Sequence, residues 1–590
     1  MSKRVVTKSK FTTFDNTELV YRAWEPEVET KSKKALIVLH RGHEHSGRLD
    51  DLINGIDAKD CWAFGYDGRG HGESPGPRGY ADDFSHLIKD LDTFVDYISK
   101  EYGIDVNDMV LVANSVGAVI ASSWVHDYAP KIRAMVLAAP AFNVKLYVPF
   151  ALPSLRVLDH IKKPAFISSY VKSKFLTKDV EQQRLYDSDP LITPQIAVNI
   201  LVGLYDASNR VVNDAGAIHV PTLVLSAEKD YVVDNKAQKK FFQGLSSKNK
   251  RFITLPNFYH GVLYEKERHL AFKECHNFIN DVFATETNIV SLKDAHKDGY
   301  THSEYENFLF QHRGITKGLF YWSQRLSMKM LGWMSKGISI GMKYGFDSGL
   351  SLDHVYRNEA QGFTWIGKII DYFYINAIGW KGIRQRKVHM QQSLDNVIEK
   401  MVSEGKPVRI MDIGAGPGRY LIETAKKFER HDVKVLVRDY SVDNINQGKI
   451  IAEDLHCTNV EFKVADAFDP STYNKDEFAP NILIVSGLYE LFPDNDLVTQ
   501  SINAATDILA DDGYVLYTGQ PWHPQLELIA ETLPNREGKK WIMRRRTQGE
   551  LDQLFEMGGA SKENMMIDKW GIFTVSTAKV KKAESLQKVG

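Results

Sequence analysis

Short apolar runs alternate with amphipathic stretches through the first part of the chain. Four of the runs have the length and composition of buried strands, whereas stretches such as 87–99 show helical periodicity. Strands that alternate with helices predict a doubly wound parallel sheet. The four predicted strands are 35–39, 109–112, 134–138 and 222–225.

A second alternation of this kind begins at 408–412 and runs to about residue 580. The stretch between the two alternations is rich in Trp, Tyr, Phe, Met and Gly and has helical patterns without clear strands. A chain of 590 residues is also too long for one core. The sequence therefore predicts an α/β protein of several parts. These are a first domain (1–283) with an insertion at about 140–218, a helical connector (284–397), a second α/β domain (398–580) and a polar tail (581–590).

Composition narrows the class of protein. The formal net charge of −1 gives no overall attraction to nucleic acid. Cys61, Cys275 and Cys457 lie far apart and without metal-ligand spacing, so we expect neither a disulfide framework nor a metal site. The N-terminus lacks the apolar core of a secretory signal, and no run of 18 apolar residues occurs. These features predict a cytoplasmic protein.

A serine stands where a predicted strand passes into a predicted helix. Ser115 is the centre of Ala-Asn-Ser-Val-Gly, which follows the strand 109–112 and opens the helical run 118–126. A nucleophilic serine needs such a sharp turn, which holds its hydroxyl above the sheet edge. Ala113 stands where the motif usually has glycine, and a methyl group should fit there.

A serine nucleophile needs a base, and the base needs an acid that orients it. In this fold the chain order is serine, acid, histidine. Asp230 lies just past the strand 222–225, and His260 lies in a loop after the next apolar run. Asp234 is an alternative acid, further into the following helix. We predict Ser115, Asp230 and His260 as a catalytic triad.

Two loops carry a family resemblance. His-Arg-Gly-His-Glu-His-Ser-Gly-Arg (40–48) and Asp-Gly-Arg-Gly-His-Gly-Glu-Ser (67–74), together with the turn at Ser115, resemble the monoacylglycerol lipase and lysophospholipase group of α/β-hydrolases. The resemblance covers roughly residues 10–283. It implies an α/β-hydrolase fold, with esterase chemistry on a single acyl chain.

The developing alkoxide of such a reaction needs an oxyanion hole of backbone N–H groups. Val116, the residue after the nucleophile, is one predicted donor, and the resemblance implies Gly42 as the second. Arg41 stands where the group usually has glycine, so its bulk is expected to narrow the rim of the hole. The insertion corresponds to the lid of the group, and its apolar runs 146–152 and 165–170 either form an acyl-chain tunnel or pack on the main domain.

A glycine loop opens the second α/β domain. The strand 408–412 ends in Asp412 and is followed by Gly414, Gly416 and Gly418, which allow a tight turn and close approach of the backbone to a ligand. This Asp-x-Gly-x-Gly-x-Gly pattern resembles the class I S-adenosylmethionine methyltransferases, which have a Rossmann-like fold. A dinucleotide-binding fold is the alternative, and five elements in register disfavour it.

The resemblance implies further cofactor residues at strand ends. Asp439 ends the second strand and would accept both ribose hydroxyls. Asp466 follows the third strand and would reach the adenine amine, and Ser486 ends the fourth beside the sulfonium. The segments 379–386 and 486–494 resemble a methyltransferase family found fused to such hydrolases. Within the second segment, Tyr489 and Glu490 are either bases for an oxygen or amine acceptor or packing residues.

The connector is basic between Lys317 and Tyr344, where no acidic residue occurs. Basic residues spaced by four or seven positions would share one helical face, with apolar residues opposite. Such a helix either lies on an anionic membrane surface or packs between two domains with a solvated basic face. Glycines at three positions weaken the prediction of one continuous helix. The basic residues are Arg325, Lys329, Lys336 and Lys343, the apolar ones Leu319, Trp322, Leu326, Met330, Trp333 and Ile340, and the glycines Gly332, Gly337 and Gly341.

These patterns together predict a bifunctional enzyme. One half would hydrolyse esters of monoacyl lipids, either lysophospholipids or monoacylglycerols. The other would transfer methyl groups from S-adenosylmethionine to an unknown acceptor, for which a lipid-related molecule is a candidate. An alternative makes the second half a non-catalytic S-adenosylmethionine-binding module that regulates the hydrolase. A third hypothesis, a membrane scaffold with inactive sites, is disfavoured by the intact triad. We expect association with the inner membrane face if the connector binds lipid.

Overall fold

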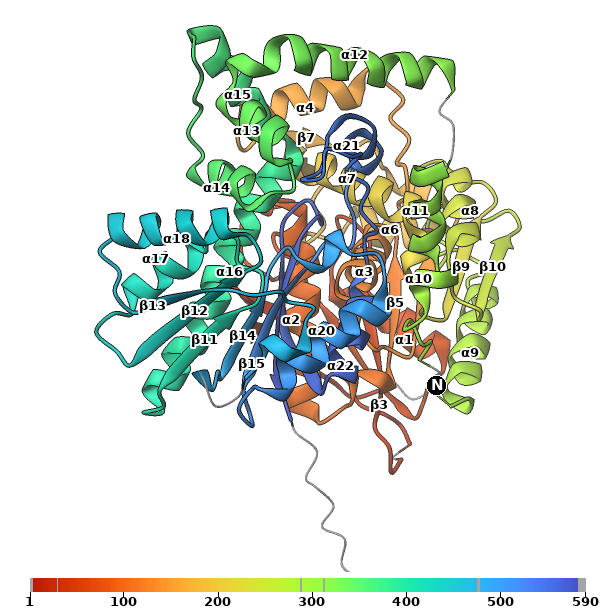
Figure 1. The fold of residues 1–590 in the computed structure, drawn as a ribbon. Coiled ribbons are helices and arrows are strands. Elements are labelled where there is room, and N and C mark those ends of the chain that lie inside the picture. Colours follow the sequence, from red (N-terminus) through yellow and green to blue (C-terminus); the bar gives the residue numbers. More distant parts are fainter. Residues whose placement is uncertain (1–3, 29, 287–288, 311–313, 475–477, 582–590) are drawn as a thin grey trace, which may run out of the picture. The chain divides into compact units, whose positions relative to one another are not determined.

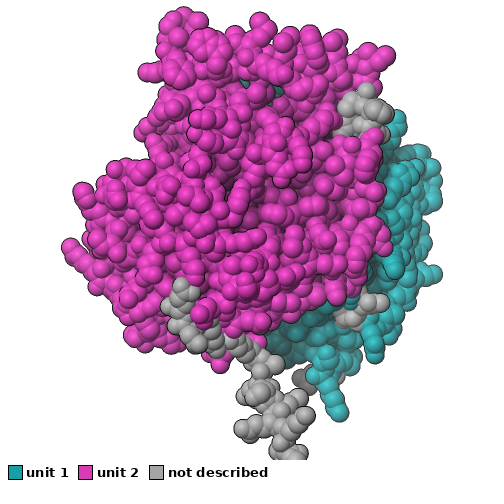
Figure 2. Space-filling model, in the orientation of Figure 1, with its two compact units in different colours: residues 1–290 teal, residues 291–590 magenta. Residues whose placement is uncertain are grey.

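The computed structural model describes residues 4–28, 30–286, 289–310, 314–474 and 478–581 (Figure 1). The chain forms two compact units, unit 1 at residues 1–290 and unit 2 at residues 291–590 (Figure 2). The predicted polar tail lies outside the described residues apart from Lys581. Within the described ranges, every helix falls short of the length and apolarity that crossing a membrane requires.

Unit 1 contains, among its described residues, an eight-stranded sheet in the order β1-β2-β4-β3-β5-β6-β9-β10. β1 and β2 form an antiparallel edge, and β4, β3, β5, β6, β9 and β10 are parallel to one another. The run of parallel strands confirms the predicted doubly wound sheet. The strands are β1 (Val6–Thr12), β2 (Glu18–Trp24), β3 (Lys34–Leu39), β4 (Cys61–Tyr66), β5 (Met109–Asn114), β6 (Ala134–Ala138), β9 (Thr222–Ala227) and β10 (Lys250–Leu255).

Apolar side chains of two helices cover one face of this sheet. Leu52 and Phe272 share a core with Leu36 of β3 and Val110 of β5. Parallel strands must be covered on both faces, so their side chains are buried along nearly the whole strand. The helices of the main domain are α1 (Asp50–Ile56), α2 (Phe84–Tyr102), α3 (Val116–Tyr128), α8 (Asn235–Gly244) and α9 (His269–Ala284).

The predicted insertion lies between β6 and β9. It consists of short elements and a small antiparallel pair, β7 with β8. A satellite core joins α4 to α7 through Leu155, Leu158, Val198 and Val202. The elements are α4 (Ala151–Ile161), β7 (Phe166–Ser168), α5 (Ser173–Leu176), α6 (Val180–Asp187), β8 (Gln195–Ala197) and α7 (Val198–Asn213).

Unit 2 contains, in its described part, a seven-stranded sheet in the order β13-β12-β11-β14-β15-β17-β16. The first five strands of this order are parallel, and β17 runs antiparallel to both of its neighbours. This sheet confirms the predicted Rossmann-like class. The strands are β11 (Val408–Asp412), β12 (Val433–Asp439), β13 (Val460–Val464), β14 (Ile482–Val485), β15 (Tyr514–Gly519), β16 (Ala560–Ile567) and β17 (Thr574–Val580).

Helices of the predicted connector belong to unit 2 and share its core. Phe346, Val355 and Trp380 are buried together with Ile572 and Phe573 from the end of the chain. In Figure 1, α13, α14 and α15 lie near one another, and α12 contacts α21. The helices of the unit are α10 (Ala295–Asp298), α11 (Tyr300–Phe310), α12 (Ile315–Leu331), α13 (Lys336–Tyr344), α14 (Gly349–Arg357), α15 (Trp365–Ile375), α16 (Ile378–Ser403), α17 (Arg419–Lys427), α18 (Val442–Asp454), α20 (Asn495–Asp507), α21 (Leu526–Thr532) and α22 (Gln548–Met557).

The basic stretch of the connector is two helices rather than one. α12 ends at Leu331, a 3-10 turn (Gly332–Met334) follows, and Ser335 caps α13 by accepting a hydrogen bond from the N–H of Ile338 at 3.1 Å. Gly332 is buried, and a Cβ there would lie 2.6 Å from the Ile338 side chain. The expectation of four basic residues along one helical face is therefore wrong, because two stand on each helix.

Candidate functional site

Ser115 occupies a strained turn between β5 and α3. Its backbone has φ 54° and ψ −112°, a conformation that residues with a side chain rarely adopt. The turn is held because the next residues approach the neighbouring strand closely. A Cβ on Gly117 would lie 2.6 Å from the carbonyl oxygen of His40 and 2.9 Å from the Leu39 Cβ. The turn therefore requires glycine at position 117 and presents Ser115 at the end of the strand, as a nucleophile elbow does.

The three predicted triad residues meet at this turn. Ser115 Oγ lies 2.8 Å from His260 Nε2, and His260 Nδ1 lies 2.8 Å from Asp230 Oδ2. Asp230 Oδ1 accepts hydrogen bonds from the N–H groups of Val232 and Val233. Burial alone would raise the pKa of Asp230, but His260 and these two N–H groups hold it below its ordinary value. An ionised Asp230 can fix the imidazole and support its positive charge.

The alternative acid, Asp234, has another task. It is the N-cap of α8, where its carboxylate accepts a hydrogen bond from the N–H of Lys236 at 2.9 Å. Asp230, not Asp234, is therefore the acid that contacts His260.

His40 orients the loop that carries Gly42. Gly68 N–H donates to His40 Nε2 at 3.1 Å, so Nδ1 carries the proton and donates to the carbonyl of Arg41 at 2.7 Å. Burial lowers the pKa of His40, which keeps the ring neutral. Because the Arg41–Gly42 peptide is trans, its N–H points away from its carbonyl and hence away from His40.

The two predicted oxyanion donors are neighbours in the structure. A Cβ on Gly42 would lie 3.0 Å from the Val116 side chain. Both residues line one cavity together with Ser115 and His260. Their assignment as oxyanion donors stays a prediction.

Arg41 is buried beside this cavity. Its guanidinium forms an ion pair with Glu44 at 2.8 Å and lies over the Tyr264 ring, 4.4 Å from the ring centre. The side chain still lines the cavity, so the expected bulk at the rim is present. The charge is directed onto Glu44 and Tyr264.

Asp67 joins the two loops that carry the resemblance. One carboxylate oxygen accepts hydrogen bonds from the N–H and the hydroxyl of Ser46, and the other accepts from the N–H of Glu73. Asp67 is fully buried. A carboxylate with three donors in a buried place fixes both loops around the serine.

The cavity at Ser115 has about 140 Å³. Side chains of the insertion form part of its wall. Some residues of the apolar runs 146–152 and 165–170 are among them, which agrees with the acyl-chain tunnel expected from the sequence. Other members of these runs, Val148 and Phe150, are instead exposed, 67% and 82% of their surface respectively. The insertion residues in the wall include Leu146, Ile167, Tyr170, Ile196, Ile200 and Leu201.

In unit 2 the glycine loop joins β11 to α17. Gly416 and Gly418 have φ of 59° and 71°, values that favour glycine. A Cβ on Gly418 would also lie 3.0 Å from the Val437 side chain. The loop, including Gly414, lines a cavity of about 520 Å³ at the ends of the parallel strands, where this kind of sheet binds ligands.

Asp412 supports the loop from behind. It is fully buried and accepts hydrogen bonds from the N–H of Gly414 at 3.0 Å and from the Tyr420 hydroxyl. Burial raises its pKa to about 7. Asp412 does not line the 520 Å³ cavity. It therefore stabilises the glycine loop and does not contact a ligand in the cavity.

The remaining predicted cofactor residues line the cavity. Asp439 accepts from the N–H groups of Gly416 at 2.9 Å and Ser441 at 2.8 Å. Asp466 is exposed and accepts from the N–H of Phe468, and Ser486 also belongs to the wall. Their roles toward a cofactor stay predictions.

Sequence reasoning missed part of this wall. Residues from α14 and the turn before it line the cavity, as do residues of the segment before α22. Neither region follows a parallel strand, so the strand-end pattern gave no signal for them. They are Asp347, Gly349, Leu352, Asp353, Tyr356, Asn535, Arg536 and Trp541.

A second cavity of about 310 Å³ adjoins the first. Arg386, Gly487, Leu491 and Trp541 line both. The two candidate bases lie in different surroundings. Glu490 lines the second cavity, whereas Tyr489 is buried and its hydroxyl lies 3.0 Å from the Ser501 hydroxyl.

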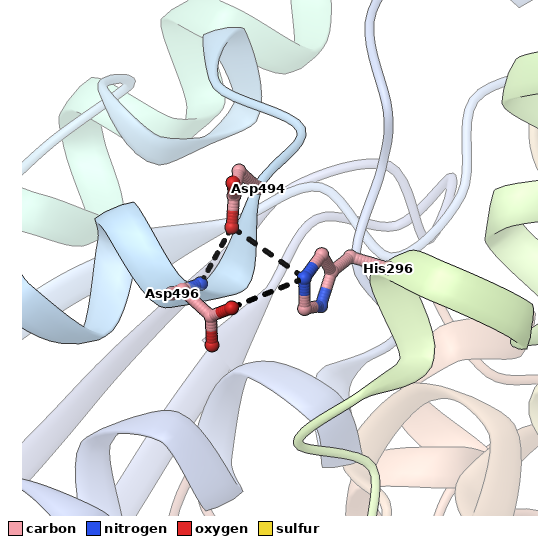
Figure 3. Close-up of side chains that lie close together, drawn as sticks. All are labelled: His296, Asp494 and Asp496. Atoms are coloured by element: carbon pink, nitrogen blue, oxygen red, sulfur yellow. Dashed lines mark hydrogen bonds and ion pairs between the residues drawn. The ribbon is translucent and has the colours of Figure 1, made fainter.

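Figure 3 shows a cluster that the sequence did not predict. His296 Nε2 lies 3.5 Å from Asp494 and 3.8 Å from Asp496. Asp494 is the N-cap of α20, accepting from the N–H of Asp496, and Lys297 lies 3.5 Å from Asp496. A helix cap with ion pairs accounts for this cluster.

Comparisons with known proteins agree with the two sheets. A family model described as "Putative methyltransferase" matches residues 275–580. "Uncharacterized protein YnbC" of Escherichia coli (strain K12) is 42% identical over 588 residues, which cover 98% of this chain and 99% of that protein. The chain belongs to this methyltransferase family.

Unit 1 of this family member is an α/β-hydrolase domain related to monoglyceride lipases. A family model described as "Serine aminopeptidase, S33" matches residues 30–267. "Monoglyceride lipase" of Homo sapiens is 30% identical over 274 residues, which cover 46% of this chain and 85% of that protein. A crystal structure of Paleococcus ferrophilus monoacylglycerol lipase is similar with a TM-score of 0.38 and 23% identity, covering 46% of this chain and 99% of that one. The predicted fusion is confirmed.

We expect Gly117→Ala to damage unit 1. The added Cβ would force Leu39 and His40, at the end of β3, away from the turn, at a cost of about 1–3 kcal/mol in the free energy of unfolding. Urea denaturation measures this loss. Gly68→Ala is the control, because a Cβ there meets its nearest atom at an ordinary 3.5 Å. Equal stability of the two variants would contradict the close approach at Gly117.

Proposed function

We propose that unit 1 is a serine ester hydrolase of monoacyl lipids, either lysophospholipids or monoacylglycerols. The observation that carries this proposal is the continuous contact from Ser115 through His260 to Asp230. The apolar side chains that the insertion contributes to the cavity suit an acyl chain. The names of the related lipases support the same substrate class.

The geometry gives each group a step in this reaction. Ser115 Oγ attacks the ester carbonyl while His260 Nε2 takes its proton, and Asp230 supports the resulting imidazolium. The N–H groups of Gly42 and Val116 stabilise the oxyanion. His260 then gives the proton to the leaving alcohol, and water repeats the sequence in reverse on the acyl-enzyme.

We propose that unit 2 binds S-adenosylmethionine and transfers its methyl group. When bound, this cofactor supplies an activated methyl group. The cavity fits it, since the glycine loop allows close approach and Asp439 and Asp466 are among the acids on its wall. By resemblance, Asp439 would hold the ribose hydroxyls, Asp466 the adenine amine, and Ser486 would lie beside the sulfonium.

We also propose that α12 places the protein on an anionic membrane surface. Trp322 of α12 and Trp333 of the turn after it are 53% and 60% exposed, and Leu319 and Met330 are exposed as well. Lys329 and Lys336 are exposed near these apolar side chains in the sequence. Exposed aromatic and basic residues together are typical of surface-binding helices.

Ser115→Ala should lower kcat for p-nitrophenyl esters by at least about 10³-fold, because the nucleophile is lost. Ser123→Ala is the matched control. Ser123 is buried on α3, and its hydroxyl has no hydrogen-bond partner among the described residues. Undiminished turnover in Ser115→Ala would refute the triad assignment.

Asp439→Ala should weaken S-adenosylmethionine binding by at least about tenfold, since charge-assisted hydrogen bonds to the ribose are lost. Titration calorimetry measures this change. The control is Asp443→Ala, an exposed acid in the first turn of α18. Unchanged affinity in Asp439→Ala would remove the ribose assignment.

The same calorimetry, combined with a methyl-transfer assay on lipid extracts, separates the enzyme from the regulatory alternative. Binding with transfer supports a methyltransferase. Tight binding without transfer, together with ester turnover that responds to the cofactor, supports a regulatory module.

Sedimentation with vesicles tests the membrane proposal. The protein should pellet with phosphatidylglycerol vesicles more than with phosphatidylcholine vesicles, and high salt should reduce the difference. Replacing Trp322 and Trp333 together by serine should lower partitioning by at least about tenfold. Met557→Ser, at an exposed apolar position ending α22, is the control. Partitioning that survives the double replacement would exclude α12 as the binding surface.

A further inference from the structure

The second cavity of unit 2 has the size and walls of a site for a small apolar molecule. Its volume of about 310 Å³ falls within the range of ligand pockets. Helices α12, α13, α14, α15, α16 and α21 each contribute apolar side chains to its wall. Wall residues include Met328, Ile370, Trp380, Ile383, Leu528 and Phe573.

Four polar atoms around this cavity lack a hydrogen-bond partner among the described residues. They are Glu490 Oε2, Gln520 Nε2, Arg386 Nε and Trp541 Nε1. Glu490, Gln520 and Arg386 are each more than nine-tenths buried. Buried polar atoms are nearly always paired, so a group of unpaired ones around one cavity points to a ligand with a polar end.

The cavity adjoins the proposed cofactor site. Arg386, Gly487, Leu491 and Trp541 form part of both walls. Two molecules in adjoining cavities can bring their reacting atoms together, and such alignment is a large part of catalysis by group transfer.

We propose that this second cavity is the methyl-acceptor site, and that it takes an apolar molecule whose hydroxyl group faces Glu490 as the general base. The inference rests on the proposed binding of S-adenosylmethionine in the adjoining cavity. It adds the class of acceptor and the residue that removes its proton.

The chemistry balances with these groups. The acceptor oxygen forms a bond to the methyl carbon as the carbon–sulfur bond breaks, and the bonding pair stays on sulfur. The hydroxyl proton passes to the Glu490 carboxylate. The products are a methyl ether, the neutral thioether and a protonated Glu490, which returns its proton to water.

The surroundings of Glu490 suit a proton acceptor. Burial raises its pKa, although the charges of Arg386 and Arg546 oppose the shift. One carboxylate oxygen contacts the Thr518 hydroxyl at 3.3 Å, which leaves Oε2 for the acceptor. His523, also on the wall, has a pKa lowered by burial to about 3, so it is neutral and cannot hold Glu490 in an ion pair.

The test uses the full chain, tritiated S-adenosylmethionine and three probes of similar apolar length. These are 1-dodecanol and 4-octylphenol, which carry hydroxyl groups, and dodecanoic acid, whose carboxylate needs no base. We expect a methyl ether from at least one hydroxyl probe. Glu490→Gln should slow that transfer at least about 100-fold, as loss of a general base does.

Two matched pairs of variants separate the site from folding effects. Met328→Trp places a large ring in the cavity, whereas Met330→Trp stands on the same helix with its side chain exposed. Glu423→Gln, on α17 and outside the cavity wall, is the control for Glu490→Gln. Of the two tryptophan variants, we expect only Met328→Trp to lose the binding of 4-octylphenol measured by calorimetry. The affinity for S-adenosylmethionine should stay within about twofold of the parent protein in all four variants.

Three outcomes would overturn the inference. They are binding of 4-octylphenol that survives Met328→Trp, transfer to dodecanoic acid alone or to none of the probes, and transfer unaffected by Glu490→Gln. Failure of the proposed function is a different result, because the parent protein would then not bind S-adenosylmethionine.

Discussion

Both candidate sites depend on one constraint, the abrupt passage from a central parallel strand into the next helix. At Ser115 the backbone enters a rarely adopted conformation, and Gly117 must lack a Cβ because the carbonyl of His40 stands in its place. After β11 the same passage needs positive φ at Gly416 and Gly418. In each unit the turn lies at the carboxyl ends of the parallel strands. It places backbone N–H groups there, beside the Ser115 side chain in unit 1 and beside the ligand cavity in unit 2. Gly117, Gly416 and Gly418 lack a side chain for this reason.

This constraint explains why so much of the candidate site could be predicted from the sequence. Residues that follow parallel strands meet at one sheet edge, so Ser115, Asp230 and His260 come together although 145 positions separate the first from the last. Position in the chain favoured Asp230 and left Asp234 as an alternative. The choice depends on local hydrogen bonds, since Asp234 caps α8 while Asp230 reaches His260.

Strand-end reasoning could not foresee what the connector does. The connector helices do not follow parallel strands. Gly349 and Tyr356 of α14 line the 520 Å³ cavity only because of tertiary packing. The helical periodicity of the sequence also continued across residues 332–335, where α12 has ended and α13 has not yet begun. The break follows from the side chain of Ser335, which caps α13, and from a buried Gly332 that packs on Ile338. Asp412 shows the same limit, because the strand-end pattern does not indicate that it is buried and accepts a hydrogen bond from the Tyr420 hydroxyl.

α12 is part of both the proposed membrane-binding surface and the wall of the proposed acceptor cavity. Gln324 and Met328, one helical turn apart, line the second cavity, while Trp322 and Met330 are exposed. An amphipathic helix normally buries its apolar face and exposes polar residues. α12 instead has apolar residues on both its cavity side and its exposed side, which is unfavourable in water and favourable against lipid. In the proposed arrangement the helix that contacts lipid also forms part of the acceptor cavity, which suits an acceptor with an apolar body.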